Sequence, residues 1–327
     1  MTKIVCETVD SSDVAKFDKS KYNSNNHWQQ LPDDYFDVLC STETKNWIDL
    51  FRSSYEIIEF DATDIAWMKR AAEIGKSTGR FSGCYEEELL DTVKKYESLS
   101  NRIFRCDKNN VPIGYFVRTD KVSLKCGQHG VGPYFGLKEI IESSCSCIHG
   151  HTPIDQTTDR LRYYVLPWIP ICMDREFRVF VHNRRITCIS SQGVYNINRT
   201  LSGLSVERRI ATIKYWIGTL VNYINSVKDL ISLNSYSIDI ALIETTASEK
   251  SVTNTEDYTF DFLEVSNYED KNSEEIDHKP LEAFLIELNC FGKEYAAGSA
   301  LFHWLLDEEK LYNCQEEDTI YFRYVIE

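Results

Sequence analysis

The sequence predicts an α+β fold in which antiparallel sheets are backed by helices. Three observations in the second half of the chain predict it. Residues 176–193 alternate apolar and polar side chains around a His-Asn-Arg turn, which is typical of a β-hairpin. Residues 205–227 repeat apolar side chains at the spacing of a helix, after a serine that can cap it. Residues 237–243 and 284–289 are apolar runs of strand length with single polar residues inside them.

The first half of the chain supports the same class with shorter elements. Residues 55–60 have the composition of a strand and precede a helical pattern. Further helices are expected over residues 85–96 and around residues 137–141, where apolar positions follow a helical period. Residues 103–106 and 113–117 are rich in β-forming side chains and flank a turn sequence, so we expect a hairpin there.

Changes in composition indicate how the chain is organised. Residues 1–30 are polar and offer little apolar surface to bury, so we expect a mobile leader. The polar segment Asp155–Arg160 suggests a boundary, which gives an N-terminal lobe over residues 31–155 and a C-terminal lobe over residues 156–327. Residues 244–279 are strongly acidic and are expected to form an inserted excursion of the C-terminal lobe.

Length, charge and cysteine usage exclude several classes of protein. The chain has 327 residues, of which 43% are hydrophobic, so it can bury a real core. Its 36 Lys and Arg against 51 Asp and Glu give a net charge of −15, which argues against direct capture of nucleic acid or an anionic membrane. The 11 cysteines are spread along a long chain without a signal-like apolar start, and no apolar run has the length of a membrane helix. We therefore expect reduced thiols in a cytoplasmic protein.

The first group of candidate site residues is basic. Arg118, Lys121 and Lys125 lie between a predicted strand and a glycine-rich loop. Cations at a strand end, beside free backbone N–H groups, can neutralise a chain of phosphates. An ordinary solvated turn would have the same composition, so both interpretations remain open.

Arg178 is a second candidate, within the predicted hairpin. Because side chains alternate along a strand, Glu176, Arg178 and Phe180 share the face opposite Phe177 and Val179. The face of Phe177 and Val179 is expected to be core, so we expect Arg178 to face a cleft or water. A plain surface arginine is the alternative.

The third group is acidic. Asp239 interrupts one apolar strand, and Glu287 and Asn289 interrupt another. Residues two apart on a strand share a face, so the oxygens of Glu287 and Asn289 could hold one divalent cation. A few oxygen ligands suit Mg²⁺, which keeps its waters and binds nucleotide phosphates. Pairing of such a carboxylate with a structural arginine is the alternative, because an unpaired buried charge is costly.

Cys145, Cys147, His149 and His151 form a possible metal cluster. In an extended strand all four would project to one side, and two cysteines with two histidines are a legitimate zinc set. Side chains two apart on a strand are poorly placed to close a tetrahedron, however, and no second ligand pair follows at the usual spacing. Zinc is therefore the weaker interpretation of this segment.

Taken in chain order, the basic strand end, the arginine on the hairpin and the carboxylates on the two later strands resemble the layout of the ATP-grasp fold. In that fold a nucleotide is held between two α+β lobes. More closely, the chain resembles the cell division cycle protein 123 family. The segments that carry the resemblance are VLPWIPICMDREFRVFVHNRRITCISSQ, FLIELNCFGKEYAAGSALFHW and, with less similarity, FVRTDKVSLKCG. The resemblance covers about residues 113–306.

The resemblance implies a site with three parts. The residues it implies as contacts of nucleotide phosphates are Arg118, Lys125 and Arg178. Those it implies as ligands of magnesium are Asp239, Glu287 and Asn289. Those it implies as the lining of the adenine at the hinge are Val165, Leu166, Pro167 and Trp168. Glu287 stands where the family has Asp, and Arg118 where a Lys is usual, and both changes keep the chemistry of the position.

The resemblance also implies a function. We expect a protein that binds ATP and Mg²⁺ and helps to assemble the translation initiation factor 2 complex by docking its gamma subunit. The alternative is an ATP-dependent ligase that activates a carboxylate as an acyl phosphate for attack by an amine or thiol, because the same phosphate and metal residues would serve it. A scaffold that binds nothing is a third interpretation.

Overall fold

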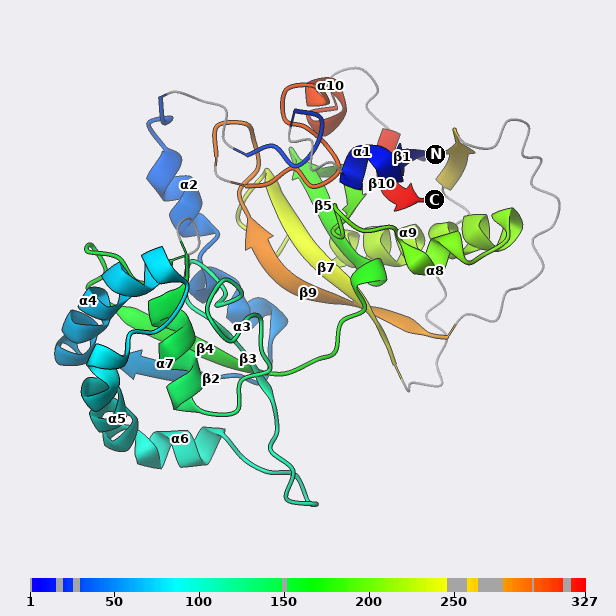
Figure 1. The fold of residues 1–327 in the computed structure, drawn as a ribbon. Helices are drawn as coiled ribbons and strands as arrows, with labels where there is room; N and C mark the ends of the chain where they lie inside the picture. Colours follow the sequence, from blue (N-terminus) through cyan, green and yellow to red (C-terminus); the bar gives the residue numbers. More distant parts are fainter. Residues whose placement is uncertain are drawn as a thin grey trace. The chain divides into compact units, whose positions relative to one another are not determined.

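The computed structural model describes residues 2–15, 20–25, 30–148, 152–245, 258–263, 279–295, 297–313 and 319–327. They form two compact units, which are described separately below. Unit 1 consists of Met1–Thr42 and Ile171–Glu327, and unit 2 consists of Glu43–Pro170. Each unit combines one sheet with its own helices (Figure 1), so the α+β class is confirmed.

Unit 2 is built on a three-stranded antiparallel sheet. Its strand order is β2-β4-β3, and its strands are β2 (Glu56–Phe60), β3 (Tyr115–Arg118) and β4 (Leu161–Pro167). Its helices are α3 (Ile48–Phe51), α4 (Ala62–Thr78), α5 (Glu86–Lys95), α6 (Glu97–Ile103) and α7 (Leu137–Ser146), with short 3-10 turns at Thr44–Asn46 and Gly83–Tyr85.

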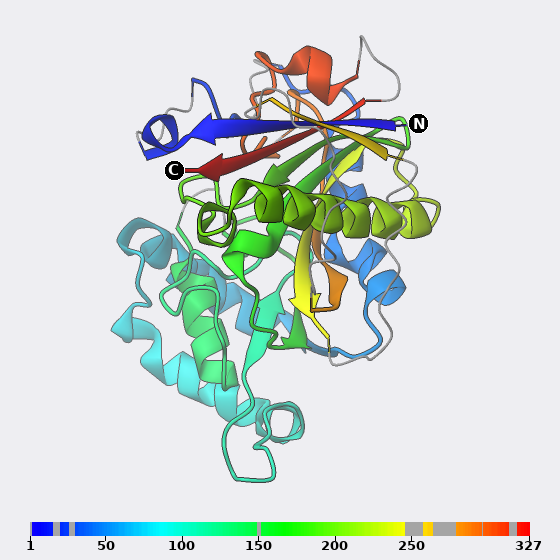
Figure 2. The ribbon, with the colours of Figure 1, turned by 90° about the vertical axis from the view of Figure 1, so that its right-hand side faces the viewer.

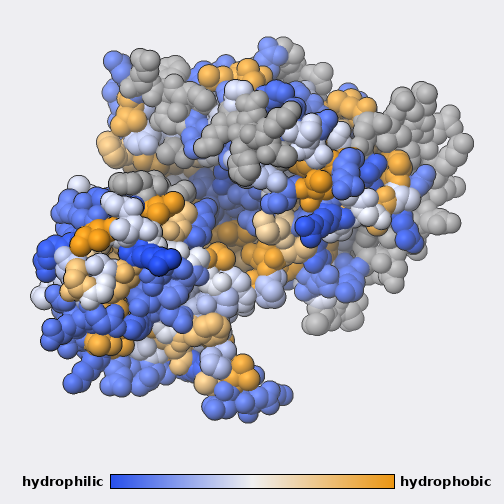
Figure 3. Space-filling model, viewed as in Figure 1, coloured by the Kyte–Doolittle hydropathy of each residue, from blue (hydrophilic) through white to orange (hydrophobic). Residues whose placement is uncertain are grey.

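The core of unit 2 lies between its sheet and α4, α5 and α7. Ile58, Met68, Leu89, Ile140 and Tyr163 are each 0% exposed within it. Hydrophilic residues cover most of the face of unit 2 that Figure 3 shows, and hydrophobic residues form small separate patches there. The helical periods read from the sequence therefore turn their apolar faces to one core, as expected.

Unit 1 is built on a seven-stranded mixed sheet with the order β8-β1-β10-β6-β5-β7-β9. The strands from β6 to β9 pair antiparallel, and those from β8 to β6 pair parallel. The strands are β1 (Thr2–Asp10), β5 (Glu176–His182), β6 (Arg185–Ser191), β7 (Tyr236–Glu244), β8 (Tyr258–Phe262), β9 (Leu281–Asn289) and β10 (Thr319–Ile326).

The helices of unit 1 differ greatly in length. They are α1 (Ser11–Ala15), α2 (Tyr35–Ser41), α8 (Arg199–Ser202), α9 (Val206–Val227) and α10 (Glu308–Leu311), with a 3-10 turn at Met173–Arg175. The long helix α9 crosses one face of the sheet (Figure 2), and its Trp216 ring lies 5.7 Å from the ring of Phe177. Ser205 caps α9 by accepting a hydrogen bond from the backbone N–H of Arg208, which confirms the helix start expected from the sequence.

The opposite face of this sheet carries a second core. Phe180 is 0% exposed and its ring lies 5.9 Å from that of Phe302 and 5.6 Å from that of Trp304. The sequence predicted core on only one face of the hairpin. The residues that cover the second face come from a segment far along the chain, and alternation within a strand cannot reveal them.

The predicted hairpin is confirmed in detail. Strands β5 and β6 pair antiparallel, and Asn183 and Arg184 form the turn with φ values of 49° and 62°. Two successive positive φ values match the right-handed twist of the strands, and asparagine tolerates this region well.

Three predictions about organisation differ from the structure. Residues 2–10 form β1 inside the large sheet instead of a mobile leader, because Ile4, Cys6 and their neighbours are buried between β8 and β10. The division between units falls after Pro170, not near residue 155, because β4 pairs with β2 and β3. In place of the hairpin expected from residues 103–106 and 113–117, the structure has a single β-bridge between Cys106 and Pro112, because Ile103 still belongs to helix α6.

Within the acidic segment 244–279, the structure describes β8, whose strand alternation was expected. Residues 246–257 and 264–278 of the predicted excursion lie outside the described residues.

Candidate functional site

A row of polar residues crosses the sheet of unit 1. Paired residues on neighbouring strands point to the same face. The strand register pairs Arg178 with Asp239, Asp239 with Glu287, and Arg178 with Ser190. It continues from Ser190 to Arg323 and from there to Glu7. We call these six residues the polar row, and in spatial order they are Glu7, Arg323, Ser190, Arg178, Asp239 and Glu287.

A β-bulge brings the two carboxylates of the row together. Ile240 pairs with Leu285, whereas Asp239 pairs with Glu287, so β9 contains one extra residue at this point. Without the extra residue Asp239 would stand opposite Ile286, and Glu287 would point to the other face. The sequence predicted both strands and both carboxylates, but the bulge that aligns them has no signal in the sequence.

Arg178 and Asp239 form a buried bidentate ion pair at the centre of the row. The Nε and Nη2 atoms of Arg178 donate to Oδ1 and Oδ2 of Asp239 at 2.7 and 2.6 Å. Gln192 donates to Oδ2 at 3.2 Å, and Nη1 of Arg178 donates to the carbonyl of Gly298 at 2.7 Å. Arg178 is 8% exposed and Asp239 2%. The prediction that Arg178 faces a cleft or water is therefore wrong for most of its side chain, and the alternative of a structural pair holds for Asp239.

Burial and charge act against each other on this pair. Burial disfavours the charged form of Arg178, but the Asp239 carboxylate outweighs it and raises the pKa of Arg178. Burial raises the pKa of Asp239, Arg178 opposes that rise, and the neighbouring Glu287 adds to it. With one arginine against two carboxylates, these three side chains carry a net charge of −1 when ionised.

Glu287 and Asn289 lie at the less buried end of the group, on one face of β9. The side chain of Glu287 is 18% exposed, and its Oε1 is 4.0 Å from Nη2 of Arg178. The Asn289 side-chain amide donates to the same Oε1 at 3.4 Å. Among the described residues, the side-chain oxygen of Asn289 has no hydrogen-bond partner. The structure thus brings together Arg178, Asp239, Glu287 and Asn289.

A second arginine in the row was missed by sequence reasoning. Arg323 donates to both oxygens of Asp307 at 2.7 and 2.6 Å and to Oε2 of Glu7 at 2.7 Å. It also donates to the carbonyl of Leu301 at 3.1 Å, as Arg178 does to that of Gly298. The available signal was a charged residue in the middle of the β-branched and aromatic run 319–326. Both arginines therefore hold the segment 298–301 over the polar row.

The basic candidates of unit 2 have unequal environments. Arg118 ends β3 and is 2% exposed, its Nε donates to Oγ1 of Thr44 at 2.8 Å, and its guanidinium lies 4.9 Å from the centre of the Trp47 ring. Lys121 and Lys125 are exposed in the turns that follow. Arg118 is therefore a buried, engaged cation, and the two lysines are surface cations.

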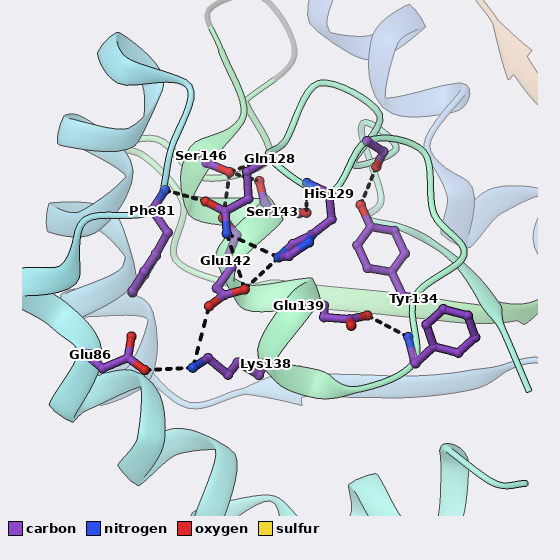
Figure 4. A network of polar contacts seen from close by, with 12 residues as sticks. Phe81, Glu86, Gln128, His129, Tyr134, Lys138, Glu139, Glu142, Ser143 and Ser146 are labelled. Carbon is purple, nitrogen blue, oxygen red and sulfur yellow. Dashed lines mark hydrogen bonds and ion pairs between the residues drawn. The ribbon is translucent and has the colours of Figure 1, made fainter. Parts of the chain in front are cut away.

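The glycine-rich loop after Lys125 is fixed to helix α7 (Figure 4). The backbone N–H groups of Gln128 and His129 donate to Ser146 and Ser143 at 2.9 and 3.2 Å. The N–H groups of Gly127 and Gly130 donate to carbonyls within the turn. These donors are satisfied inside the protein, so the expectation of free backbone N–H groups for a phosphate is not met at these four positions.

The predicted hinge residues lie at the end of β4. Val165 and Leu166 are buried at 1% and 7% exposure, while Pro167 is exposed and Trp168 partly buried. The backbone N–H of Trp168 donates to the carbonyl of Gly114 at 3.1 Å.

The cysteine and histidine segment does not form the extended strand that a shared face required. Cys145 lies in α7, and Cys147 follows the helix. Burial raises the pKa of both thiols, that of Cys147 to about 12, which disfavours the thiolate that binds metal. His149 and His151 lie outside the described residues. The described part of the chain holds no group of three or more His, Cys, Asp or Glu that could bind a metal ion.

Of the helices that the structure describes, none combines the length and the apolar character that crossing a membrane requires.

Comparison with models of known protein families found no match, and comparison with curated protein sequences found none. Comparison with solved structures did find matches. Cdc123 from Schizosaccharomyces pombe aligns with a TM-score of 0.50 at 13% sequence identity, covering 88% of this chain and 96% of that chain. The chain has the Cdc123 fold. A C-terminally truncated Cdc123 from the same organism aligns with a TM-score of 0.50 at 12% identity and the same coverage. The predicted α+β class and the resemblance to Cdc123 are therefore confirmed at the level of the fold. At this identity the likeness to Cdc123 concerns the fold alone.

Proposed function

We propose that this protein binds ATP together with Mg²⁺ and helps to assemble the translation initiation factor 2 complex by docking its gamma subunit. The observation that carries the nucleotide part is the net negative group of Arg178, Asp239 and Glu287, beside the side-chain oxygen of Asn289. The likeness to Cdc123 over most of both chains supports the assembly part, because the sequence resembles that family.

We assign Glu287 and Asn289 as the residues that would hold Mg²⁺. A carboxylate and an amide oxygen are the hard ligands that this ion prefers, and the donor set therefore fits it. Both oxygens of Asp239 already accept hydrogen bonds from Arg178, so Asp239 contributes charge and fixes the arginine. Bound Mg²⁺ supplies charge neutralisation and orientation of phosphate oxygens.

Arg178 can serve the phosphates in addition to its structural contacts. It uses three of its five N–H groups on Asp239 and Gly298. The remaining donors belong to Nη1 and Nη2, and Nη2 is the atom that lies 4.0 Å from Glu287. A phosphate oxygen near Glu287 would therefore find a charge-assisted donor whose position Asp239 fixes.

The candidates of unit 2 receive separate roles in the proposal. We assign phosphate contact to Lys125, because it is exposed, and a positioning role to Arg118, because it is buried against Thr44 and Trp47. Val165, Leu166, Pro167 and Trp168 stay the proposed adenine lining at the end of β4.

The assembly part is tested by titrating the full chain with recombinant gamma subunit in buffer containing ATP and Mg²⁺, by calorimetry. We expect saturable formation of a complex. Absence of binding at concentrations in the tens of micromolar, with both proteins folded, would overturn this part of the proposal.

A second measurement on the same preparation distinguishes the assembly function from the ligase alternative. The protein is supplied with ATP and a panel of carboxylates and amines, and ADP is quantified. We expect no ADP above the level of the protein without these substrates. ADP formation that requires a carboxylate and an amine together would instead support an ATP-grasp ligase.

A further inference from the structure

Helix α2 of unit 1 presents an exposed aromatic and acidic surface. None of its seven residues, all of which the structure describes, is buried. Phe36 is 68% exposed, the highest fraction of any large apolar side chain among the described residues, and Leu31 just before the helix is 51% exposed. Asp33 and Asp37 flank Phe36 in the sequence and are also exposed. We call Leu31, Asp33, Phe36 and Asp37 the α2 surface.

The position of α2 is fixed by contacts beside the end of β9 (Figure 1). The ring of Tyr35 stacks on that of Tyr295 with centres 5.9 Å apart and planes within 10°. The hydroxyl of Tyr295 donates to Asp34 at 3.1 Å, and Oγ1 of Thr42 lies 3.7 Å from Sγ of Cys290. Because Tyr35 anchors the helix, the Phe36 side chain points outward from an ordered surface.

Phe36 itself is held edge-on to its neighbour. Its ring centre lies 5.4 Å from that of Tyr35, with planes at 89°. A pre-oriented, exposed aromatic ring loses little conformational freedom when it enters a pocket of a partner, and such residues dominate the binding energy of many protein interfaces.

The sequence around Phe36 is acidic and lacks basic residues. No Lys or Arg occurs between Lys21 and Lys45, whereas Asp33, Asp34 and Asp37 lie within that stretch. In the described part of the chain, neither Asp33 nor Asp37 has an ion-pair partner. The α2 surface therefore offers a negative rim around an apolar centre.

We propose that the α2 surface docks a protein partner that presents an apolar pocket for Phe36 surrounded by Lys and Arg. Charge complementarity selects this occupant, because acidic residues steer and orient a basic protein surface. The same charge would repel nucleic acid and anionic membranes, and it would repel a second copy of the same surface. The inference rests on the proposed function, since that function supplies the partner used as the probe.

The test measures binding of recombinant gamma subunit to the full chain and to two variants. Phe36→Ala removes the apolar anchor, and Asp33→Asn with Asp37→Asn removes two charges without changing side-chain shape. We expect Phe36→Ala to raise the Kd about 10-fold or more. We expect the double variant to slow association several-fold and to weaken its dependence on salt.

Each variant has a matched control elsewhere on unit 1. Leu306→Ala truncates an apolar side chain that is 67% exposed, nearly as much as Phe36. Asp229→Asn with Glu282→Gln removes two charges from exposed carboxylates outside the α2 surface. The controls should bind like the unaltered chain, and thermal unfolding checks that all variants fold.

The outcomes separate the inference from the proposed function. If the unaltered chain binds the gamma subunit and the α2 variants bind equally well, the inference is wrong and the function stands. If the unaltered chain does not bind, the assembly function fails and the inference fails with it. Hydrogen exchange gives a readout without substitutions, because the complex should protect the backbone amides of residues 35–41. Unchanged exchange of these amides in a formed complex would overturn the inference.

Discussion

Arg178 and Asp239 stand opposite each other on β5 and β7 and join through two hydrogen bonds of 2.7 and 2.6 Å. The pair also fixes the segment that contains Gly298, so it links the candidate nucleotide site to the cover of the sheet. Removal of one partner from such a pair leaves a buried charge uncompensated, which is far more costly than the loss of a surface ion pair.

Arg178→Ala should therefore destabilise the protein by roughly 3–5 kcal/mol, because Asp239 would stay buried without its cation. Arg178→Lys should destabilise the protein by less than Arg178→Ala does, since a lysine keeps the charge but cannot form both hydrogen bonds at once. Urea unfolding at pH 7 measures both. The control is Arg208→Ala, an exposed residue of α9, with an expected change within about 0.5 kcal/mol. A loss below about 1 kcal/mol for Arg178→Ala would contradict the role assigned to the pair.

Gly127→Ala should loosen the loop after Lys125. A Cβ at Gly127 would lie 2.4 Å from the carbonyl oxygen of Ser143 on α7, a backbone atom that cannot move aside cheaply. We expect a lower melting temperature and faster hydrogen exchange at Gln128 and His129, whose N–H groups donate to α7. Gly83→Ala is the control, because nothing lies within 4 Å of its added Cβ. Equal melting temperatures for both variants would show that the close contact has no role.

The hairpin and the long helix were accessible to sequence reasoning because their signals are local. Alternation over residues 176–193, the turn at Asn183 and the cap at Ser205 each lie within a few residues of the element they define. β1 was missed because its apolar residues are few, and its place in the sheet depends on β8 and β10, which lie far along the chain.

His182 should make stability depend on pH. Its ring stacks on Phe291 with centres 5.1 Å apart, and burial lowers the pKa of His182 below its usual 6.5. As the pH falls through about 6.5, the unfolded chain takes up a proton that the folded protein resists until lower pH, so this group reduces stability toward acid.

Thermal unfolding of the unaltered protein and of His182→Gln, each at pH 7.5 and 5.5, measures this contribution. The variant should lose less stability between the two pH values than the unaltered protein does. An equal or greater loss in the variant would show that protonation of His182 does not contribute as described.

Four residues of the candidate site, Arg178, Asp239, Glu287 and Asn289, were predictable, but the strand register that aligns them was not. Asp239, Glu287 and Asn289 were recognisable as polar residues in apolar strands, and the structure places them together on β7 and β9. The bulge that aligns Asp239 with Glu287 and the commitment of both Asp239 oxygens to Arg178 depend on the register of three strands. Such relations arise only when distant parts of the chain pair.

The most direct test of the central claim is calorimetry of ATP binding with and without Mg²⁺. It compares the unaltered chain with Glu287→Gln and with the control Glu282→Gln, which lies at the exposed end of β9. We expect the unaltered chain and the control to bind ATP at least about 10-fold more tightly with Mg²⁺ than with a chelator, and Glu287→Gln to lose that difference while it melts at a similar temperature. ATP binding that is absent from the unaltered chain, or that keeps its full dependence on Mg²⁺ in Glu287→Gln, would contradict the account.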